Sequence, residues 1–186
     1  MDFDAHFRQG LPYQEFLDAY GTDEHRRRWG EVFDRVRLSE TQHQLLTGFV
    51  REMKVLCLAG VWCGDCVEQC PIFQRFALTA PIIQLRFVDR DADQQLAEEL
   101  SLCGGKRVPV VVMLSEDGQE LSRMGDRTLS KYRRMAADQL GPSCPTGIVP
   151  PAQSLLDAVT QDWLDEFERV QLMLRMSPRL RERHGD

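Results

Sequence analysis

A continuous apolar run in the first half of the chain constrains its fold more than any other feature. Residues 55–59 read Val-Leu-Cys-Leu-Ala, with no charged or amide side chain among them. A strand with one face in water alternates apolar and polar residues, whereas a strand covered on both faces is apolar throughout. The run therefore predicts a central strand in a sheet covered by helices, which belongs to the α/β class.

The segments around this run divide the chain into four parts. Residues 1–52 show only helical spacing and form an N-terminal helical extension, in which Ser39 and Gln42 are a candidate capping box. Residues 141–151 are rich in proline and glycine and indicate a linker, and residues 152–186 form a long amphipathic helix with a tail. The main domain, residues 53–140, is predicted to contain a strand at 54–59, a helix at 63–80 interrupted at Pro71, a strand at 82–88, a helix at 91–102, antiparallel strands at 108–114 and 120–124, and a helix at 128–140.

Charge and hydropathy argue against two classes of partner. Lys and Arg number 23 against 29 Asp and Glu, a formal net charge of -6, whereas a phosphate backbone requires a clustered basic surface. No apolar run approaches the roughly 18 residues that a membrane helix needs. We therefore expect no nucleic acid and no membrane as partner. Six cysteines without a signal peptide indicate a cytoplasmic chain whose thiols are free, bind metal or do redox chemistry.

Cys63 and Cys66 are separated by two residues at the junction between the central strand and the next helix. The first turn of a helix brings positions i and i+3 together, so the two sulfurs can cycle between dithiol and disulfide. Cys63 falls at the helix N-terminus, where free N–H groups and the helix dipole favour its thiolate. Cys66 falls one turn inside, where it can resolve a mixed disulfide. The spacing alone also fits half of a zinc site or two small core residues.

Residues 62–66, Trp-Cys-Gly-Asp-Cys after an apolar strand, resemble the active site of the thioredoxins, which have Trp-Cys-Gly-Pro-Cys. Pro71 falls where that family has a helix-kinking proline, and Val108-Pro109 ahead of an apolar strand resembles its cis-proline. The resemblance covers residues 55–140. With its helical additions, the chain is similar to an uncharacterised bacterial group of thioredoxin-like proteins with Trp-Cys-Gly-Asp-Cys.

The resemblance implies a thioredoxin-like fold, a central mixed sheet flanked by helices, here with an N-terminal helical extension and a long C-terminal helix. It implies a thiol-disulfide oxidoreductase, more specifically a disulfide reductase, in which Cys63 attacks a protein or small-molecule disulfide and Cys66 resolves the product. An unidentified reductant would restore the dithiol, and neither a cofactor nor a metal is expected. The backbone before a cis proline would pair with an extended substrate segment, although a plain strand start in trans is the alternative. The supporting residues of this site are Trp62, Gly64, Asp65, Val108 and Pro109.

Two residues depart from the thioredoxin pattern. Asp65 replaces the proline between the cysteines, and its charge near the Cys63 sulfur should disfavour the thiolate and favour a reducing couple. Its carboxylate can also simply accept hydrogen bonds from the first helical turn. Cys57 stands where the family has a buried carboxylate, so the usual proton acceptor for Cys66 is missing. Cys57 itself is most simply a small core residue.

The other cysteines have less defined roles. Cys70 is expected on the same side of the helix as Cys66, where a third thiol can exchange with the pair, although core packing is the simpler expectation. Cys103 falls in a loop that should run near the active site and is the candidate auxiliary thiol. Cys144, in the linker, is expected to be exposed and incidental.

Two other functions remain open from the sequence. A metal or iron–sulfur protein is one, because Cys63, Cys66 and Cys70 form a C-x2-C-x3-C run, although no second Cys-x-x-Cys completes a tetrahedral site. The other is a binding module with weak redox activity whose end helices dock a partner. The C-terminal helix carries an apolar stripe that fits such docking, a homodimer through this helix, or packing on its own domain; the stripe comprises Leu156, Val159, Trp163, Phe167, Val170 and Leu174.

Overall fold

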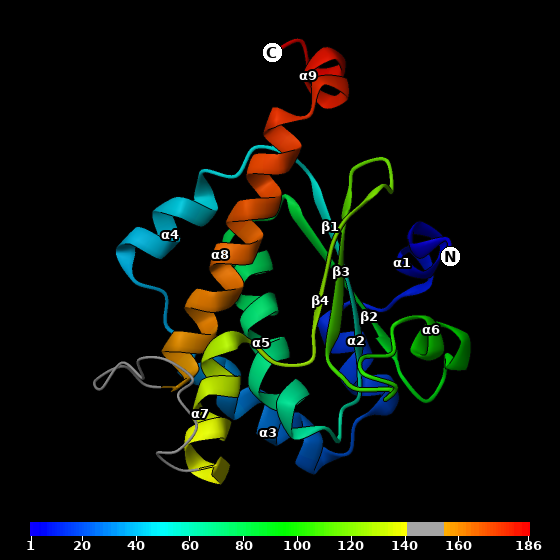
Figure 1. Cartoon of the computed structure of the whole chain (residues 1–186), viewed down its shortest axis with the longest axis vertical. Coiled ribbons are helices and arrows are strands. Elements are labelled where there is room, and N and C mark those ends of the chain that lie inside the picture. Colours follow the sequence, from blue (N-terminus) through cyan, green and yellow to red (C-terminus); the bar gives the residue numbers. More distant parts are fainter. Residues whose placement is uncertain (141–154) are drawn as a thin grey trace.

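A four-stranded mixed sheet forms the centre of the computed structural model, which describes residues 1–140 and 155–186 (Figure 1). The strands are β1 (Met53–Ala59), β2 (Ile83–Asp89), β3 (Val110–Ser115) and β4 (Glu120–Gly125), in the spatial order β2-β1-β3-β4. β1 is parallel to β2 and antiparallel to β3, and β3 is antiparallel to β4. The apolar run lies in the buried central strand β1, and the predicted mixed sheet of an α/β fold is confirmed.

Helices cover both faces of this sheet (Figure 1). On one face lies α5 (Gly64–Thr79), which packs against α3 (Asp23–Arg35), α4 (Glu40–Thr47) and α8 (Leu155–Met176). The other face carries α1 (Phe3–Gln9) and α6 (Gln94–Glu99), while α2 (Tyr13–Tyr20) packs on β2. α7 (Leu129–Leu140) follows β4 and packs on α8, and α9 (Pro178–His184) ends the chain.

Two helices differ from their predictions. α5 continues through Pro71, which lies inside one helix rather than at an interruption. A proline cannot donate to the carbonyl four residues earlier, here that of Val67, but buried neighbours on both sides hold the helix together. α6 is shorter than predicted because Asp93 caps its start, accepting a hydrogen bond of 2.9 Å from the N–H of Leu96.

The N-terminal extension is bound to the sheet and to the loop after β1. Leu11 and Phe87 exchange backbone hydrogen bonds of 2.8 and 2.7 Å, so that the extension covers the edge of β2. Trp29 of α3 is fully buried and donates its indole N–H to the carbonyl of Val61 at 2.9 Å. The extension therefore positions the chain just before Cys63.

Local sequence signals explain where the helices of this extension begin. Ser39 and Gln42 form the predicted capping box at α4, with hydrogen bonds of 3.2 and 2.9 Å between their side chains and backbones. α1 lies in the predicted helical extension but was not predicted as a separate helix, and its Phe3 and Phe7 are buried on the sheet. An ion pair of 2.8 Å between Lys54 and Asp4 fixes α1 to β1.

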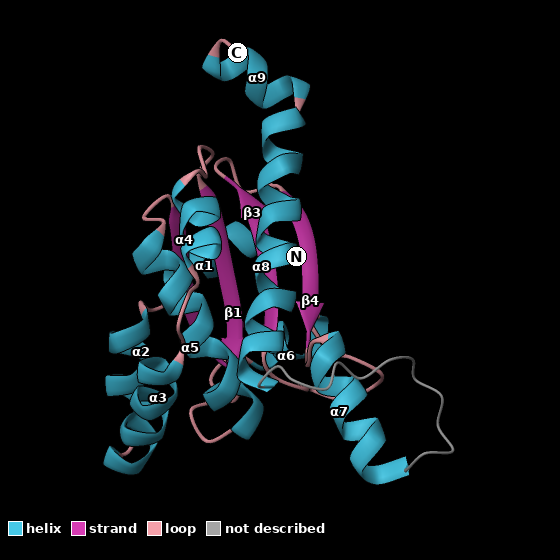
Figure 2. Cartoon of the chain, turned by 90° about the vertical axis from the view of Figure 1, so that its left-hand side faces the viewer, coloured by secondary structure: helices cyan, strands magenta, loops and turns pink. Residues whose placement is uncertain are grey.

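The apolar stripe of the C-terminal helix is buried within its own chain, as Figure 2 shows by placing α8 over the sheet along the strands. Trp163 meets Phe73 of α5 with ring centroids 4.6 Å apart, and Phe167 meets Phe76 at 5.2 Å. Such aromatic contacts add to the free energy gained by burying the rings. Of the three expectations for the stripe, packing on its own domain is the one that the structure shows.

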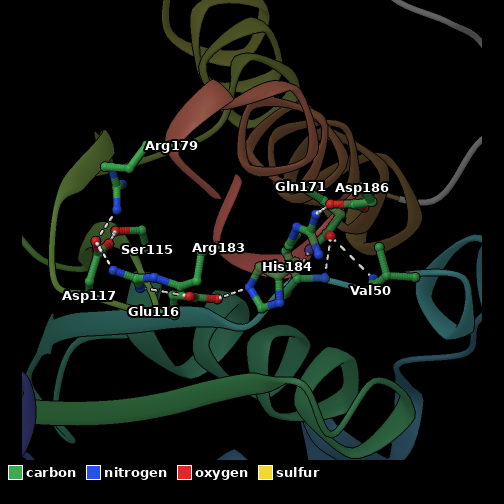
Figure 3. Close-up of polar contacts among 10 residues, drawn as sticks. Val50, Ser115, Glu116, Asp117, Gln171, Arg179, Arg183, His184 and Asp186 are labelled. Atoms are coloured by element: carbon green, nitrogen blue, oxygen red, sulfur yellow. Dashed lines mark hydrogen bonds and ion pairs between the residues drawn. The ribbon is translucent and has the colours of Figure 1, made fainter. Parts of the chain in front are cut away.

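The final helix, α9, is held to the turn between β3 and β4 by ion pairs (Figure 3). Arg183 and His184 contact Glu116 at 2.7 and 2.8 Å, and Arg179 pairs with Asp117. The predicted tail is therefore a helix with a defined position. The end of the chain is fixed in the same way, because Asp186 pairs with the buried Arg51.

The predicted linker at 141–151, with Cys144, lies outside the described residues, as do residues 152–154 of the predicted C-terminal helix. Within residues 1–140 and 155–186, no helix is long and apolar enough to cross a membrane.

Candidate active site

Cys63 caps the N-terminus of α5. Its backbone N–H donates to the carbonyl of Gly60 at 3.0 Å, and its carbonyl accepts from the N–H of Val67 at 2.9 Å, so the loop after β1 turns directly into the helix. A Cβ at Gly60 would lie 2.8 Å from the indole ring of Trp62, and only glycine lets this ring fold over the backbone. The Cys63 side chain is half-buried and the Trp62 ring is exposed at the rim.

Cys66 lies one turn further along α5 and is fully buried. The N–H of Gly60 points at its sulfur at 3.5 Å. Both cysteines are free thiols in this structure, and their side chains interact directly. The predicted division into an accessible thiol and a covered thiol is thus present in the geometry.

The Val108–Pro109 peptide bond is cis, in the conformation that the resemblance implies. The Cys63 thiol donates to the carbonyl of Val108 at 3.4 Å. Gly125 at the end of β4 lies against this segment, since a Cβ there would be 2.6 Å from the carbonyl of Pro109. The segment before β3, the end of β4 and the start of α5 therefore meet beside the Cys63 sulfur.

The interaction between the two thiols moves their pKa values in opposite directions. At Cys63 the hydrogen bond to Cys66, followed by burial, raises the pKa. At Cys66 burial raises the pKa, but hydrogen bonds from Cys63, Cys70 and the Gly60 N–H outweigh it and lower the pKa below the usual thiol value. The two thiols titrate as a pair, so these directions describe the pair rather than either residue alone. The helix N-terminus and the contact with Cys66 act in opposite directions on Cys63, and the expectation that Cys63 is the more acidic thiol stays a prediction.

Asp65 is paired rather than free beside the nucleophile. Its carboxylate lies 2.6 Å from Arg127 and 4.0 Å from Lys131. The backbone N–H groups of Asp65 and Cys66 lower the pKa of Cys63, whereas the Asp65 charge acts on Cys66, whose pKa it raises. The predicted repulsion between Asp65 and a Cys63 thiolate is thus offset by two cations that the sequence did not connect to the site.

A buried carboxylate that the sequence analysis missed lies on the other side of Arg127. Asp126 accepts a hydrogen bond of 2.5 Å from Tyr132 and pairs with Arg127 at 3.0 Å and with Arg107 at 3.4 Å. Burial raises the pKa of Asp126, but these partners outweigh it and lower the pKa. No sequence motif marks this residue, although Arg127 and Tyr132 are close to it in sequence and only Arg107 comes from another segment.

A cleft of about 430 Å³ opens beside the Cys63 sulfur. Its wall carries more cationic than anionic side chains, and Arg90 lies over the Trp62 ring at 4.4 Å from its centroid. The lining residues are Trp62, Cys63, Asp65, Arg90, Lys106, Arg107, Val108, Asp126 and Arg127.

Two further cysteines lie behind the pair, and a third does not approach it. Cys57 of β1 and Cys70 of α5 are fully buried with their sulfurs 3.9 Å apart. Cys103 is exposed and is not among the residues that line the cleft, although Lys106 to Val108 of the same loop are. Among the described residues, no cluster of three or more His, Cys, Asp or Glu side chains has the geometry to hold a metal ion.

Comparison with known families agrees with this geometry. The family model described as thioredoxin matches residues 10–137. The chain belongs to the thioredoxin family. The match begins well before residue 55, so the thioredoxin-family region includes most of the helical extension. No curated protein is similar to this chain in sequence.

Two solved structures share the fold of this chain over most of its length. A protein of unknown function from Pseudomonas aeruginosa has a TM-score of 0.67 at 19% identity, over 88% of this chain and 95% of that chain. An HIV epitope scaffold has a TM-score of 0.66 at 17% identity, over 90% and 99% of the two chains. Thioredoxin from Fasciola hepatica has a TM-score of 0.36 at 23% identity, over 51% and 88%. The first two similarities extend beyond residues 53–140, so helical additions are part of the fold that these thioredoxin-like chains share.

Proposed function

We propose that this thioredoxin-family chain is a thiol-disulfide oxidoreductase that reduces disulfides, with Cys63 as the attacking thiol and Cys66 as the resolving thiol. One observation supports this most strongly. Cys63 lines a cleft, whereas Cys66 is fully buried and contacts Cys63. A disulfide from outside therefore reaches only the first sulfur, and the second can attack only what is bound to the first.

The proposed reaction consists of two successive thiol–disulfide exchanges. As Cys63 attacks a sulfur of the substrate, its proton passes to Cys66, the substrate S–S bond breaks and one substrate thiolate leaves. A mixed disulfide now joins Cys63 to the other half of the substrate. Cys66 then attacks the Cys63 sulfur, gives its proton to the second leaving thiolate and closes the Cys63–Cys66 disulfide. Two electrons have moved to the substrate, and an unidentified dithiol or thiol reductant restores the pair by the reverse exchange.

The geometry around Val108 supports an extended protein segment as substrate. Its backbone lies before the cis proline at the cleft, where a substrate strand can pair with it by strand addition. Small-molecule disulfides need only reach Cys63. Because the cycle requires a compartment that keeps thiols reduced, the cytoplasm is the location that we propose.

Reduction of insulin disulfides by dithiothreitol tests this function. Wild-type protein should accelerate the reaction, and Cys63→Ser should abolish the acceleration. Cys103→Ser is the matched control, because it removes an exposed thiol away from the cleft and should leave the rate unchanged. Equal acceleration by Cys63→Ser, or none by the wild type, would contradict the proposal.

A further inference from the structure

A second pair of thiols lies directly beneath the first. Cys57 is on β1 and Cys70 is on α5, one helical turn beyond Cys66. Their sulfurs are 3.9 Å apart, and neither side chain has any exposed surface. Cys57 points from the sheet toward α5, because its sulfur contacts that of Cys70.

Cys70 joins this inner pair to the outer pair. Its side chain interacts with Cys66 as well as with Cys57. The four thiols therefore form one row that begins with Cys63 at the cleft, continues through Cys66 and Cys70, and ends at Cys57. Solvent and substrate reach this row at Cys63.

We propose that Cys57 and Cys70 are a second redox-active pair, which is oxidised by the Cys63–Cys66 disulfide and lets one reduced chain reduce two substrate disulfides. This inference rests on the function proposed above for Cys63 and Cys66. On this proposal Cys57 and Cys70 are more than packing residues, because their dithiol supplies two further electrons from within the core.

Two internal exchanges carry the oxidation inward. In the first, the Cys70 thiol attacks Cys66, a Cys66–Cys70 disulfide forms, the Cys63–Cys66 bond breaks and the proton of Cys70 ends on Cys63. In the second, the Cys57 thiol attacks Cys70, a Cys57–Cys70 disulfide forms, the Cys66–Cys70 bond breaks and the proton of Cys57 ends on Cys66. The outer dithiol is regenerated without an external reductant, so it can reduce another substrate.

The transient Cys66–Cys70 disulfide requires a local movement of α5. Residues four positions apart on a helix have Cα atoms about 6 Å apart, within the range that disulfides span, but their Cβ atoms lie about 5–6 Å apart and must approach to roughly 4 Å. Pro71 leaves the carbonyl of Val67 without its helical N–H donor, so this turn of α5 carries fewer hydrogen bonds than a regular helix. Rotation of two side chains brings the sulfurs of Cys57 and Cys70 from 3.9 Å toward the roughly 2 Å of a disulfide.

The environment confines the inner pair to internal exchange. Burial raises the pKa of both Cys57 and Cys70. Neutral thiols without exposed surface react poorly with reagents in solution, and they exchange with a disulfide that is already in contact with them. The inner pair should therefore be oxidised through Cys63 and Cys66 or not at all.

A single-turnover experiment with oxidised glutathione as the probe tests the inference. All proteins carry Cys103→Ser and Cys144→Ser, so that the four thiols of the row remain. They are fully reduced, freed of reductant and mixed with excess probe without oxygen. Glutathione released per chain is measured, and disulfides are mapped by mass spectrometry after alkylation under denaturing conditions.

The parent protein should reduce two disulfides per chain and contain a Cys57–Cys70 disulfide. Cys57→Ala and Cys70→Ala should each reduce one, a twofold loss, and Cys63→Ser should reduce none and keep Cys57 and Cys70 as thiols. One disulfide per chain in the parent, with Cys57 and Cys70 recovered as thiols, overturns the inference and leaves the proposed function intact. An inner disulfide that forms equally fast in Cys63→Ser also overturns it, and a parent that reduces none overturns the proposed function itself.

Discussion

The indole N–H of Trp29 donates a hydrogen bond of 2.9 Å to the carbonyl of Val61, two residues before Cys63. α3 thereby holds the loop that carries the proposed nucleophile. Trp29 is fully buried and is packed by Phe16 and Phe87, so the loop is tied to the rigid part of the N-terminal extension. The helical addition is thus part of the active-site framework.

Trp29→Phe should weaken both the fold and the site. The substitution keeps an aromatic ring but leaves the buried Val61 carbonyl without its donor, which costs about 1–3 kcal/mol. For a chain of this size, the melting temperature should fall by about 2–10 °C. Alkylation of Cys63 should also change in rate, because the loop is no longer fixed. Phe16→Leu is the control, because it perturbs the same aromatic cluster without removing the hydrogen bond and should leave the alkylation rate unchanged.

The sequence predicted where the strand and the two cysteines of the site lie, but not which charged side chains pair beside them. The apolar run at 55–59 and the Cys63 and Cys66 spacing are local patterns, and each placed its element correctly. The ion pair between Asp65 and Arg127 joins residues that lie far apart in sequence, and no periodicity connects them. The acidity of Cys63 likewise depends on contacts with Cys66 and the Val108 carbonyl, which the position of Cys63 at a helix N-terminus does not reveal.

At the ends of the chain too, local spacing predicted a helix but not the residues against which it packs. The spacing of the C-terminal stripe predicted a long amphipathic helix, but the partner of that stripe, α5, became evident only from the packing of Trp163 on Phe73. α1 carries too few apolar residues for a periodic signal, and its position depends on contacts with the sheet. Short helices of this kind are set by tertiary packing rather than by propensity.

Asp65→Asn should make the Cys63–Cys66 couple more oxidising. The Asp65 charge raises the pKa of Cys66, so its removal stabilises the thiolate and with it the reduced pair. A change of half a pKa unit corresponds to about 15 mV for a two-electron couple, and we expect an increase of about 10–30 mV. Equilibration with glutathione buffers measures the potential. Arg127→Ala exposes the same charge and should shift the potential in the opposite direction; a shift of the same sign in both variants would refute this account.

The attachment of α9 should depend on pH through Glu116. The hydrogen bond from Arg183 lowers the pKa of this carboxyl group. A carboxyl group whose pKa is lowered by folding stabilises the fold above its ordinary pKa of about 4.3, and the contribution is lost as the pH falls through the lowered value. Glu116→Gln should therefore melt about 1–3 °C below the wild type at pH 7, with a difference that vanishes toward pH 3.

Glu182→Gln is the control for this comparison. Glu182 is on α9, is exposed and has no ion pair with any residue that the structure describes. Its substitution should leave the melting temperature unchanged at every pH. A difference between Glu116→Gln and the wild type that persists unchanged at pH 3 would show that the carboxylate charge is not responsible.

Trapping of mixed disulfides tests the central assignment, Cys63 as attacking and Cys66 as resolving thiol, most directly. Cys66→Ser removes the thiol that releases the substrate, so incubation with a disulfide-containing protein such as insulin should leave a covalent adduct on Cys63 that mass spectrometry locates and dithiothreitol removes. Cys63→Ser should form no such adduct at Cys66, which is fully buried. An adduct on Cys66 in Cys63→Ser, together with none on Cys63 in Cys66→Ser, would contradict the assignment.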